Sequence, residues 1–143
     1  MRSKIRDRNI LFLSHDNDGL SFIAETIARQ LLPPGTHVFS AGLKGGKIDP
    51  KAVQVLQEIG IDATTQEVKS LDVIPTKDID LVVTFGTPAE VQPLIPSRAR
   101  QRTWNISDPC REPRADLDTF RHARDEINSK IGSLFLDYWR NVA

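Results

Sequence analysis

Apolar residues form two kinds of pattern along the chain, short unbroken runs and longer segments in which they recur at helical spacing. The short runs are typical of buried strands, and the longer segments are typical of amphipathic helices. The strands are expected at 10–13, 37–42, 78–85 and 101–106. The helices are expected at 21–32, from Pro50 to just before Gly60, at 88–94 and at 117–139. Residues 66–69 fit either a brief strand or an extended connection.

Strands that alternate with helices predict an α/β fold, with a parallel sheet flanked by helices on both faces. The 143 residues fit one domain, 1–143, which is long enough to bury a core. Asp49 and Pro50 suit the N-cap and first turn of the second helix, and Gly60 suits its end. The side chains expected to face the core from the helices are Ile23, Ile27, Leu31, Val53, Leu56, Ile59, Phe120, Ala123, Ile127, Ile131, Leu134 and Tyr138.

Composition and charge narrow the class of protein. Lysine plus arginine equals aspartate plus glutamate at 19 each, so no overall field favours nucleic acid or an anionic membrane as a partner. The sequence has no apolar run of the roughly 18 residues that a membrane span needs, and no apolar stretch of a secretory signal follows the basic first residues. Cys110 is the only cysteine, which excludes an intrachain disulfide and a cysteine-based zinc site. We therefore expect a cytoplasmic protein with no cofactor and no nucleic-acid or membrane partner.

The loop Ser14 to Ser21, SHDNDGLS, joins the first strand to the first helix. Such a loop commonly binds an anion through backbone N–H groups, because a helix N-terminus carries partial positive charge. This loop instead carries Asp16 and Asp18, and it contains no lysine or arginine. Two unit charges at about 4 Å interact by about 4 kcal/mol at an intermediate effective dielectric, more than the roughly 0.3 to 2 kcal/mol that a helix terminus offers. We expect the loop to reject phosphate.

Five segments in a distinctive order carry a resemblance to a known family. They are ILFL-loop-S-x-x-AE at 10–25, FSAG at 39–42, IDPKAVQVLQEIGID at 48–62, DIDLVVTF at 78–85 and WNISDP at 104–109. Over about residues 8–139 the chain resembles the low-molecular-weight protein tyrosine phosphatases. Its closing stretch looks most like their thioredoxin-coupled arsenate reductase branch. The resemblance implies the phosphatase-like fold.

The family resemblance also implies a Cys-x5-Arg loop, in which a thiolate attacks phosphorus or arsenic and the arginine stabilises the oxygens. Aligned without gaps, Ser14 stands at the cysteine position and Leu20 at the arginine position. A serine hydroxyl ionises far above the thiol pKa of about 8.5, and leucine offers no bidentate clamp. Asp108 keeps the position of the general acid. The candidate binding residues are the other loop positions, His15, Asp16, Asn17, Asp18, Gly19 and Ser21, of which Asn17 and Ser21 match the family's loop.

The arsenate reductase branch implies a relay of three cysteines, which a chain with one cysteine cannot form. Gly86 stands where the first resolving cysteine is expected, and Cys110 matches neither relay partner. The leading hypothesis is an inactive phosphatase-like protein that serves as a binding or regulatory module. Its partner, a protein or a small molecule, would bind at the former active-site mouth. The alternative is a phosphatase-family hydrolase with weak or repurposed activity, which would use Asp108 together with a metal ion at the acidic loop.

Several polar residues admit two interpretations. His15, Asp16, Asp18 and Asp108 are side chains of the kinds that bind divalent cations. A solvated acidic loop whose aspartates cap the next helix is the favoured interpretation. The spacing does not match an EF-hand, so we assign no metal site. Trp104 and Trp139 are interpreted as packing residues. The arginines that alternate with acids near the end are interpreted as a solvated face, namely Arg111, Arg114, Arg121 and Arg124.

Overall fold

The computed structural model describes residues 9–15, 19–42, 47–64, 67–85, 95 and 98–142. The strands are β1 (Asn9–Ser14), β2 (His37–Gly42), β3 (Leu81–Thr84) and β4 (Arg100–Thr103). The α-helices are α1 (Leu20–Leu31), α2 (Pro50–Gln57) and α4 (Leu117–Val142). Three single turns of 3-10 helix are η1 (Leu71–Val73), η2 (Thr76–Asp78) and η4 (Pro109–Arg111). Every strand pair is parallel, in the order β2-β1-β3-β4, which confirms the predicted α/β fold.

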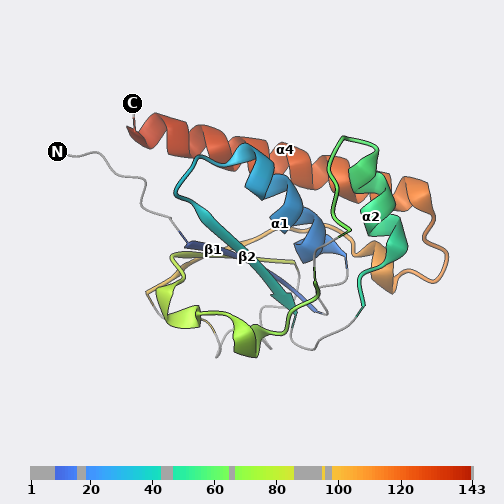
Figure 1. The fold of residues 1–143 in the computed structure, drawn as a ribbon, viewed down its shortest axis with the longest axis horizontal. Helices are drawn as coiled ribbons and strands as arrows, with labels where there is room; N and C mark the ends of the chain where they lie inside the picture. Colours follow the sequence, from blue (N-terminus) through green and yellow to red (C-terminus); the bar gives the residue numbers. More distant parts are fainter. Residues whose placement is uncertain are drawn as a thin grey trace.

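The three α-helices lie on one face of the sheet (Figure 1), where they enclose the larger core cluster. Ile10 and Phe12 of β1 point into that cluster, whereas Leu11 and Leu13 point into a smaller cluster on the other face. The smaller cluster includes residues from around η1 and η2 (Figure 1). β1 is therefore buried on both faces, which explains its unbroken apolar run. The helix expected at 88–94 lies outside the described residues.

Two strands are shorter than predicted, because turns replace their ends. The segment expected to start at residue 78 begins as η2, and Ile79 is buried in the smaller cluster before β3 starts at Leu81. β4 stops at Thr103, and the Ile106 N–H donates to the Trp104 carbonyl in a tight turn, 3.1 Å away. Residues 67–69 form the extended connection rather than a strand, with one isolated bridge between Gly42 and Ser70.

The predicted signals of α2 are confirmed. Asp49 is its N-cap, and the side-chain Oδ1 accepts a hydrogen bond of 2.9 Å from the Lys51 N–H. Pro50 occupies the first turn, where a missing N–H costs nothing. Gly60 follows the helix with a φ of 85°, a left-handed conformation that favours glycine. Within the described residues, no helix has both the length and the apolar composition needed to cross a membrane.

Most of the expected helical core is buried, but the side chains at two helix ends are not. Leu31 and Ile59 are 39% and 42% exposed, so their assignment to the core is wrong. They line a groove of about 300 Å³ where α1 and the turn after α2 diverge, together with Ile27, Gln30, Gly60, Ile61 and Asn128. Val53 is only partly buried, and the side chain of Tyr138 lies outside the described residues.

The interpretation of the late arginines as a solvated face is wrong for Arg124, which is 9% exposed. Arg124 Nη1 donates to the Val55 carbonyl at 2.9 Å and to Glu58 Oε1 at 2.8 Å. Arg121 donates to Glu58 Oε1 at 2.9 Å and to Glu58 Oε2 at 2.7 Å. The hydrogen bond from Arg121 lowers the pKa of Glu58 to about 2. These contacts fasten the end of α2 to α4.

Candidate functional site

The loop after β1 lies where the connections of the sheet change direction. β1 leads through α1 to β2 on one side, while β3 pairs with β1 on the other. Open parallel sheets commonly bind ligands at such a switch point, beyond the carboxyl ends of the strands. Ser14 ends β1 opposite Gly42 of β2, and Leu20 begins α1. The two residues that flank the predicted loop, Ser14 and Leu20, therefore lie at the edge of the sheet where such folds commonly bind ligands.

Ser14 and Ser21 face each other across the base of the loop. Their Oγ atoms are 2.5 Å apart, in a hydrogen bond in which either hydroxyl can donate. Ser14 is 2% exposed and Ser21 is fully buried. The Ser14 hydroxyl is thus shielded from solvent, and its hydrogen bond joins the end of β1 to the first turn of α1.

Leu20 packs into the larger core cluster between α1 and the sheet, and it is 1% exposed. The position that the family resemblance assigns to the arginine is thereby occupied by an apolar core side chain. No cation reaches the loop from this position. The first turn of α1 also carries no acidic residue.

Asp108 approaches the loop from η4. Its Oδ1 accepts a hydrogen bond of 2.9 Å from the Cys110 N–H, and its Oδ2 lies 4.0 Å from the Arg111 Nε. A Cβ atom added to Gly19 would lie 3.5 Å from the same Oδ1 and 2.6 Å from Cys110 Sγ. The Cys110 thiol in turn donates to Asp49 Oδ2 at 4.0 Å. We call Ser14, Gly19, Ser21, Asp49, Asp108 and Cys110 the loop mouth.

The loop mouth contains predicted and unforeseen residues. Of the predicted residues, Ser14 contacts Ser21, and the Cβ position of Gly19 lies 3.5 Å from Asp108 Oδ1. Cys110 and Asp49 were not among the candidates, because contacts between residues 19, 49 and 110 leave no local pattern. The only hint was the adjacency of Cys110 to the Asp108-Pro109 pair.

The metal hypothesis depends partly on residues that the structure does not describe. Asp16, Asn17 and Asp18 lie outside the described residues, and His15 lies just after β1. Among the residues that are described, no three His, Cys, Asp or Glu side chains gather as a metal site would require. Gly19 is the N-cap of α1 and makes no side-chain hydrogen bond, so capping by the aspartates stays a prediction.

A second feature beside the loop mouth is a hollow of about 280 Å³ after β4. Its described lining is Trp104, Asn105, Ile106 and Ser107. The Trp104 ring packs on Phe85 with the ring centroids 5.8 Å apart, which confirms Trp104 as a packing residue. The side chain of Trp139 lies outside the described residues.

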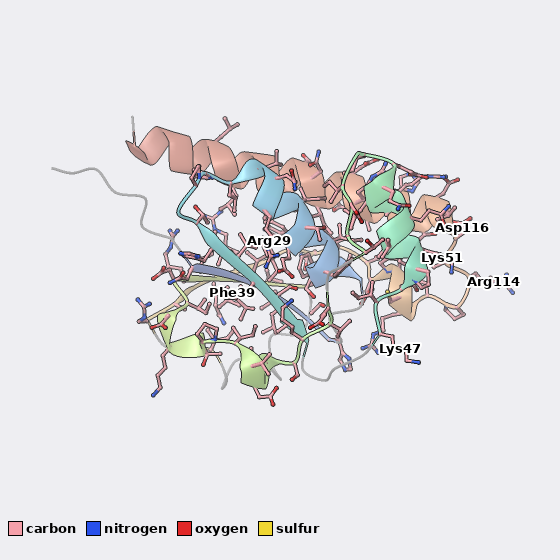
Figure 2. The ribbon with its side chains drawn as sticks, in the orientation of Figure 1. Arg29, Phe39, Lys47, Lys51, Arg114 and Asp116 are labelled. Atoms are coloured by element: carbon pink, nitrogen blue, oxygen red, sulfur yellow. The ribbon has the colours of Figure 1, made fainter. Side chains whose placement is uncertain are left out.

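Glu25, one turn after Ser21, is a buried charged residue for which sequence analysis gave no role. Its side chain is 0% exposed, and the Ser40 hydroxyl donates to its Oε1. Oε2 forms an ion pair with Arg29 without an aligned hydrogen bond, and Lys69 Nζ lies 3.5 Å from Oε1. Arg29 extends from α1 towards β2 (Figure 2), where it also donates to the Val38 carbonyl. The signal was a glutamate within an otherwise apolar helical stretch.

Comparisons with known proteins agree with this geometry. Residues 9–142 match the family model described as "Low molecular weight phosphotyrosine protein phosphatase". The chain belongs to this family. An "Arsenate reductase" of Staphylococcus aureus (strain Newman) is 32% identical over 125 residues, which cover 87% of this chain and 93% of that protein.

Solved structures show the same fold at lower identity. "An arsenate reductase in oxidized state" is 24% identical and has a TM-score of 0.81, over 92% of this chain and 98% of that one. "YwlE arginine phosphatase from Geobacillus stearothermophilus" is 22% identical, with a TM-score of 0.81 over 92% and 93% of the two chains. The phosphatase-like fold is thus established for this family member. Residue 14 of this chain is a serine and residue 20 is a leucine, and both side chains are buried.

Proposed function

We propose that this family member has lost both phosphatase and arsenate reductase activity. The burial of Leu20 is the observation that supports this most, because the arginine position then supplies no cation to the loop. Phosphoryl transfer depends on positive charge and donors placed around the transferring oxygens, where charge develops in the transition state. A core leucine provides neither.

Ser14 supports the same proposal. An uncharged hydroxyl is a weak nucleophile unless a neighbouring base removes its proton. The hydrogen-bond partner of Ser14 is another serine hydroxyl, and both are buried. The thiolate chemistry of the family needs a cysteine in the loop, and the one cysteine, Cys110, belongs to η4. A three-cysteine relay cannot be assembled from one cysteine.

Asp108 is not a general acid in this proposal. A general acid has no leaving group to protonate when no nucleophile attacks. The carboxylate instead caps η4 through the Cys110 N–H and approaches Arg111. We assign Asp108 a structural role at the loop mouth.

The proposed activity is binding of a protein or small-molecule partner at the loop mouth. Lys47, Lys51 and Arg114 lie at this end of the molecule (Figure 2), close in sequence to the acids Asp49 and Asp116. Charges of both signs suit a polar partner surface better than a phosphate dianion. A cytoplasmic location stays a prediction. Fold alone does not fix function, so the activities named for the relatives are not carried over to this chain.

Turnover assays test the loss of activity. Purified protein should hydrolyse p-nitrophenyl phosphate no faster than a buffer blank, and it should not reduce arsenate with a thioredoxin system. Ser14→Ala is the matched variant, because it removes the hydroxyl at the nucleophile position and little else. Turnover by the natural protein that Ser14→Ala abolishes would overturn the proposal.

A further inference from the structure

The groove of about 300 Å³ between the end of α1 and the turn after α2 carries exposed apolar surface. Four large apolar side chains of the described residues are exposed, and two of them, Leu31 and Ile59, line this groove. Leu31 lies about 16 Å along α1 from Leu20, because each helical residue rises 1.5 Å. None of the loop-mouth residues belongs to the described lining. The groove is therefore a second candidate surface, separate from the loop mouth.

The described lining of the groove contains no charged side chain. Its polar side chains are two exposed amides, Gln30 of α1 and Asn128 of α4. A primary amide carries both hydrogen-bond donors and acceptors, so it can pair with another amide. A surface made of apolar groups and amides is thus complementary to a copy of itself.

The charged residues that adjoin the groove residues in the chain are engaged elsewhere. Arg29 forms an ion pair with Glu25 and extends towards β2 (Figure 2). Glu58 accepts hydrogen bonds from two arginines of α4, and Asp62 accepts from the N–H and the hydroxyl two residues on. The chain as a whole has a formal net charge of zero, so long-range repulsion between two copies is absent.

We propose that this groove binds a second copy of the chain and forms a dimer with two-fold symmetry. A two-fold interface brings the same patch of both copies together, so the patch must be complementary to itself, as this uncharged groove is. Leu31 and Ile59 of each copy cover the groove of the other, and the amides pair at its rim. The groove is smaller than a standard interface of about 800 Å² per partner, so the dimer is weak. The proposal does not depend on the function of the loop mouth.

Analytical ultracentrifugation of the natural protein tests dimer formation. The sedimentation coefficient should rise from the monomer value towards the dimer value between about 10 µM and about 1 mM, the range in which a small interface associates. A protein that stays monomeric throughout this range would overturn the proposal.

Two variants place a carboxylate in the groove. Leu31→Glu should weaken the dimer about tenfold or more, because the two-fold axis brings like charges together in an apolar interface. Gln30→Glu should weaken it about threefold or more, and this change of an exposed amide keeps the test valid if Leu31→Glu is poorly folded.

Matched controls change the same residue types outside the described lining. Leu136→Glu alters an exposed leucine of α4, and Gln54→Glu alters an exposed glutamine of α2. Both controls should dimerise like the natural protein. Equal weakening by a groove variant and its control would contradict the proposal.

A charge-exchange experiment tests the two-fold symmetry. Leu31→Glu and Leu31→Lys should each associate poorly, whereas their equimolar mixture should associate about tenfold more tightly than either variant alone, because opposite charges then meet. A mixture that associates no better than the separate variants would rule out a two-fold interface at Leu31.

The dye 1-anilinonaphthalene-8-sulfonate tests the other occupant that the groove could hold, a small apolar molecule. The fluorescence per mole of natural protein should fall as the protein concentration rises, because the second copy covers the groove. Dye binding that Leu31→Glu removes from a protein that stays monomeric would assign the groove to a small molecule and overturn the proposal.

Discussion

Leu20 and Glu25 lie five positions apart on α1, and both side chains are buried. They differ in the contacts that they make. Leu20 stands where the family resemblance expects a charged arginine, and it packs in the core. Glu25 is fully buried, and its carboxylate contacts the Ser40 hydroxyl, Arg29 and Lys69. The comparison shows that the buried polar side chain of Glu25 joins α1 to its neighbours through ion pairs and a hydrogen bond, whereas Leu20 contributes packing alone.

The largest effect is expected for Glu25→Gln, which removes the charge and leaves Arg29 facing a neutral amide. The new amide NH₂ would be buried against the Arg29 donors, and an unsatisfied buried donor costs about 1 to 3 kcal/mol. The lost hydrogen bonding to a charged group costs about 1.5 to 3 kcal/mol more, so we expect about 4 kcal/mol lower stability here. Urea denaturation measures the change. The control is Lys69→Gln, which removes a partly exposed partner at 3.5 Å and should cost about 1 kcal/mol or less. Equal losses in the two variants would mean that Glu25 does not organise the cluster.

Leu20→Ala tests whether residue 20 belongs to the core. Truncating a buried leucine costs about 2 to 5 kcal/mol through lost packing, and we expect about 3 kcal/mol. Leu31→Ala is the matched variant on the same helix, and because Leu31 is 39% exposed it should cost about 1 kcal/mol or less. A Leu20→Ala protein as stable as Leu31→Ala would place residue 20 outside the core. Equilibrium unfolding in urea measures both variants.

A smaller, pH-dependent effect is expected for Glu58, which fastens α2 to α4. Its pKa falls from 4.5 to about 2 in the folded protein because Arg121 donates to it. The folded state therefore holds the proton less tightly than the unfolded state does. The resulting stability is present above about pH 4.5 and is lost as the pH falls towards 2.

Thermal melts between pH 7 and pH 2.5 measure this effect, with Glu58→Gln as the variant. Glu58→Gln should lower Tm at pH 7, and its Tm should approach that of the natural protein as the pH falls. Glu126→Gln, an exposed glutamate of α4, serves as the control and should leave the pH profile unchanged. A constant Tm difference between Glu58→Gln and the natural protein across this range would contradict the assignment.

Local patterns in the sequence predict much of the fold. β1, α1 and the Asp49 cap of α2 are each specified by neighbouring residues, through an unbroken apolar run, helical spacing and a capping side chain. The ends of β3 and β4 differ from the prediction, because Ile79 and Ile106 continue the apolar pattern from turns without strand pairing. An apolar pattern reports burial and does not by itself distinguish a strand from a buried turn.

The site was predictable to a smaller degree. The order of segments aligns Ser14 and Leu20 with the cysteine and arginine positions that the family resemblance implies, and it locates the loop in the sequence. The contact of Cys110 with Gly19 and the buried role of Arg124 depend on tertiary packing between distant segments. The alternating charges near the end of the chain form the same sequence pattern whether a given arginine faces solvent or a neighbouring helix. The sequence alone therefore does not reveal that Arg124 is buried.

Vanadate binding tests the central claim most directly, because vanadate mimics the oxyanion and needs no chemical step. A ligand at about 100 times its Kd adds about 2.7 kcal/mol of apparent stability, which is about 10 °C in Tm for a domain of this size. Melting curves with millimolar vanadate, against potassium chloride at equal ionic strength, should show no shift. A rise of several degrees with vanadate alone would show that the loop still binds oxyanions and would contradict the account.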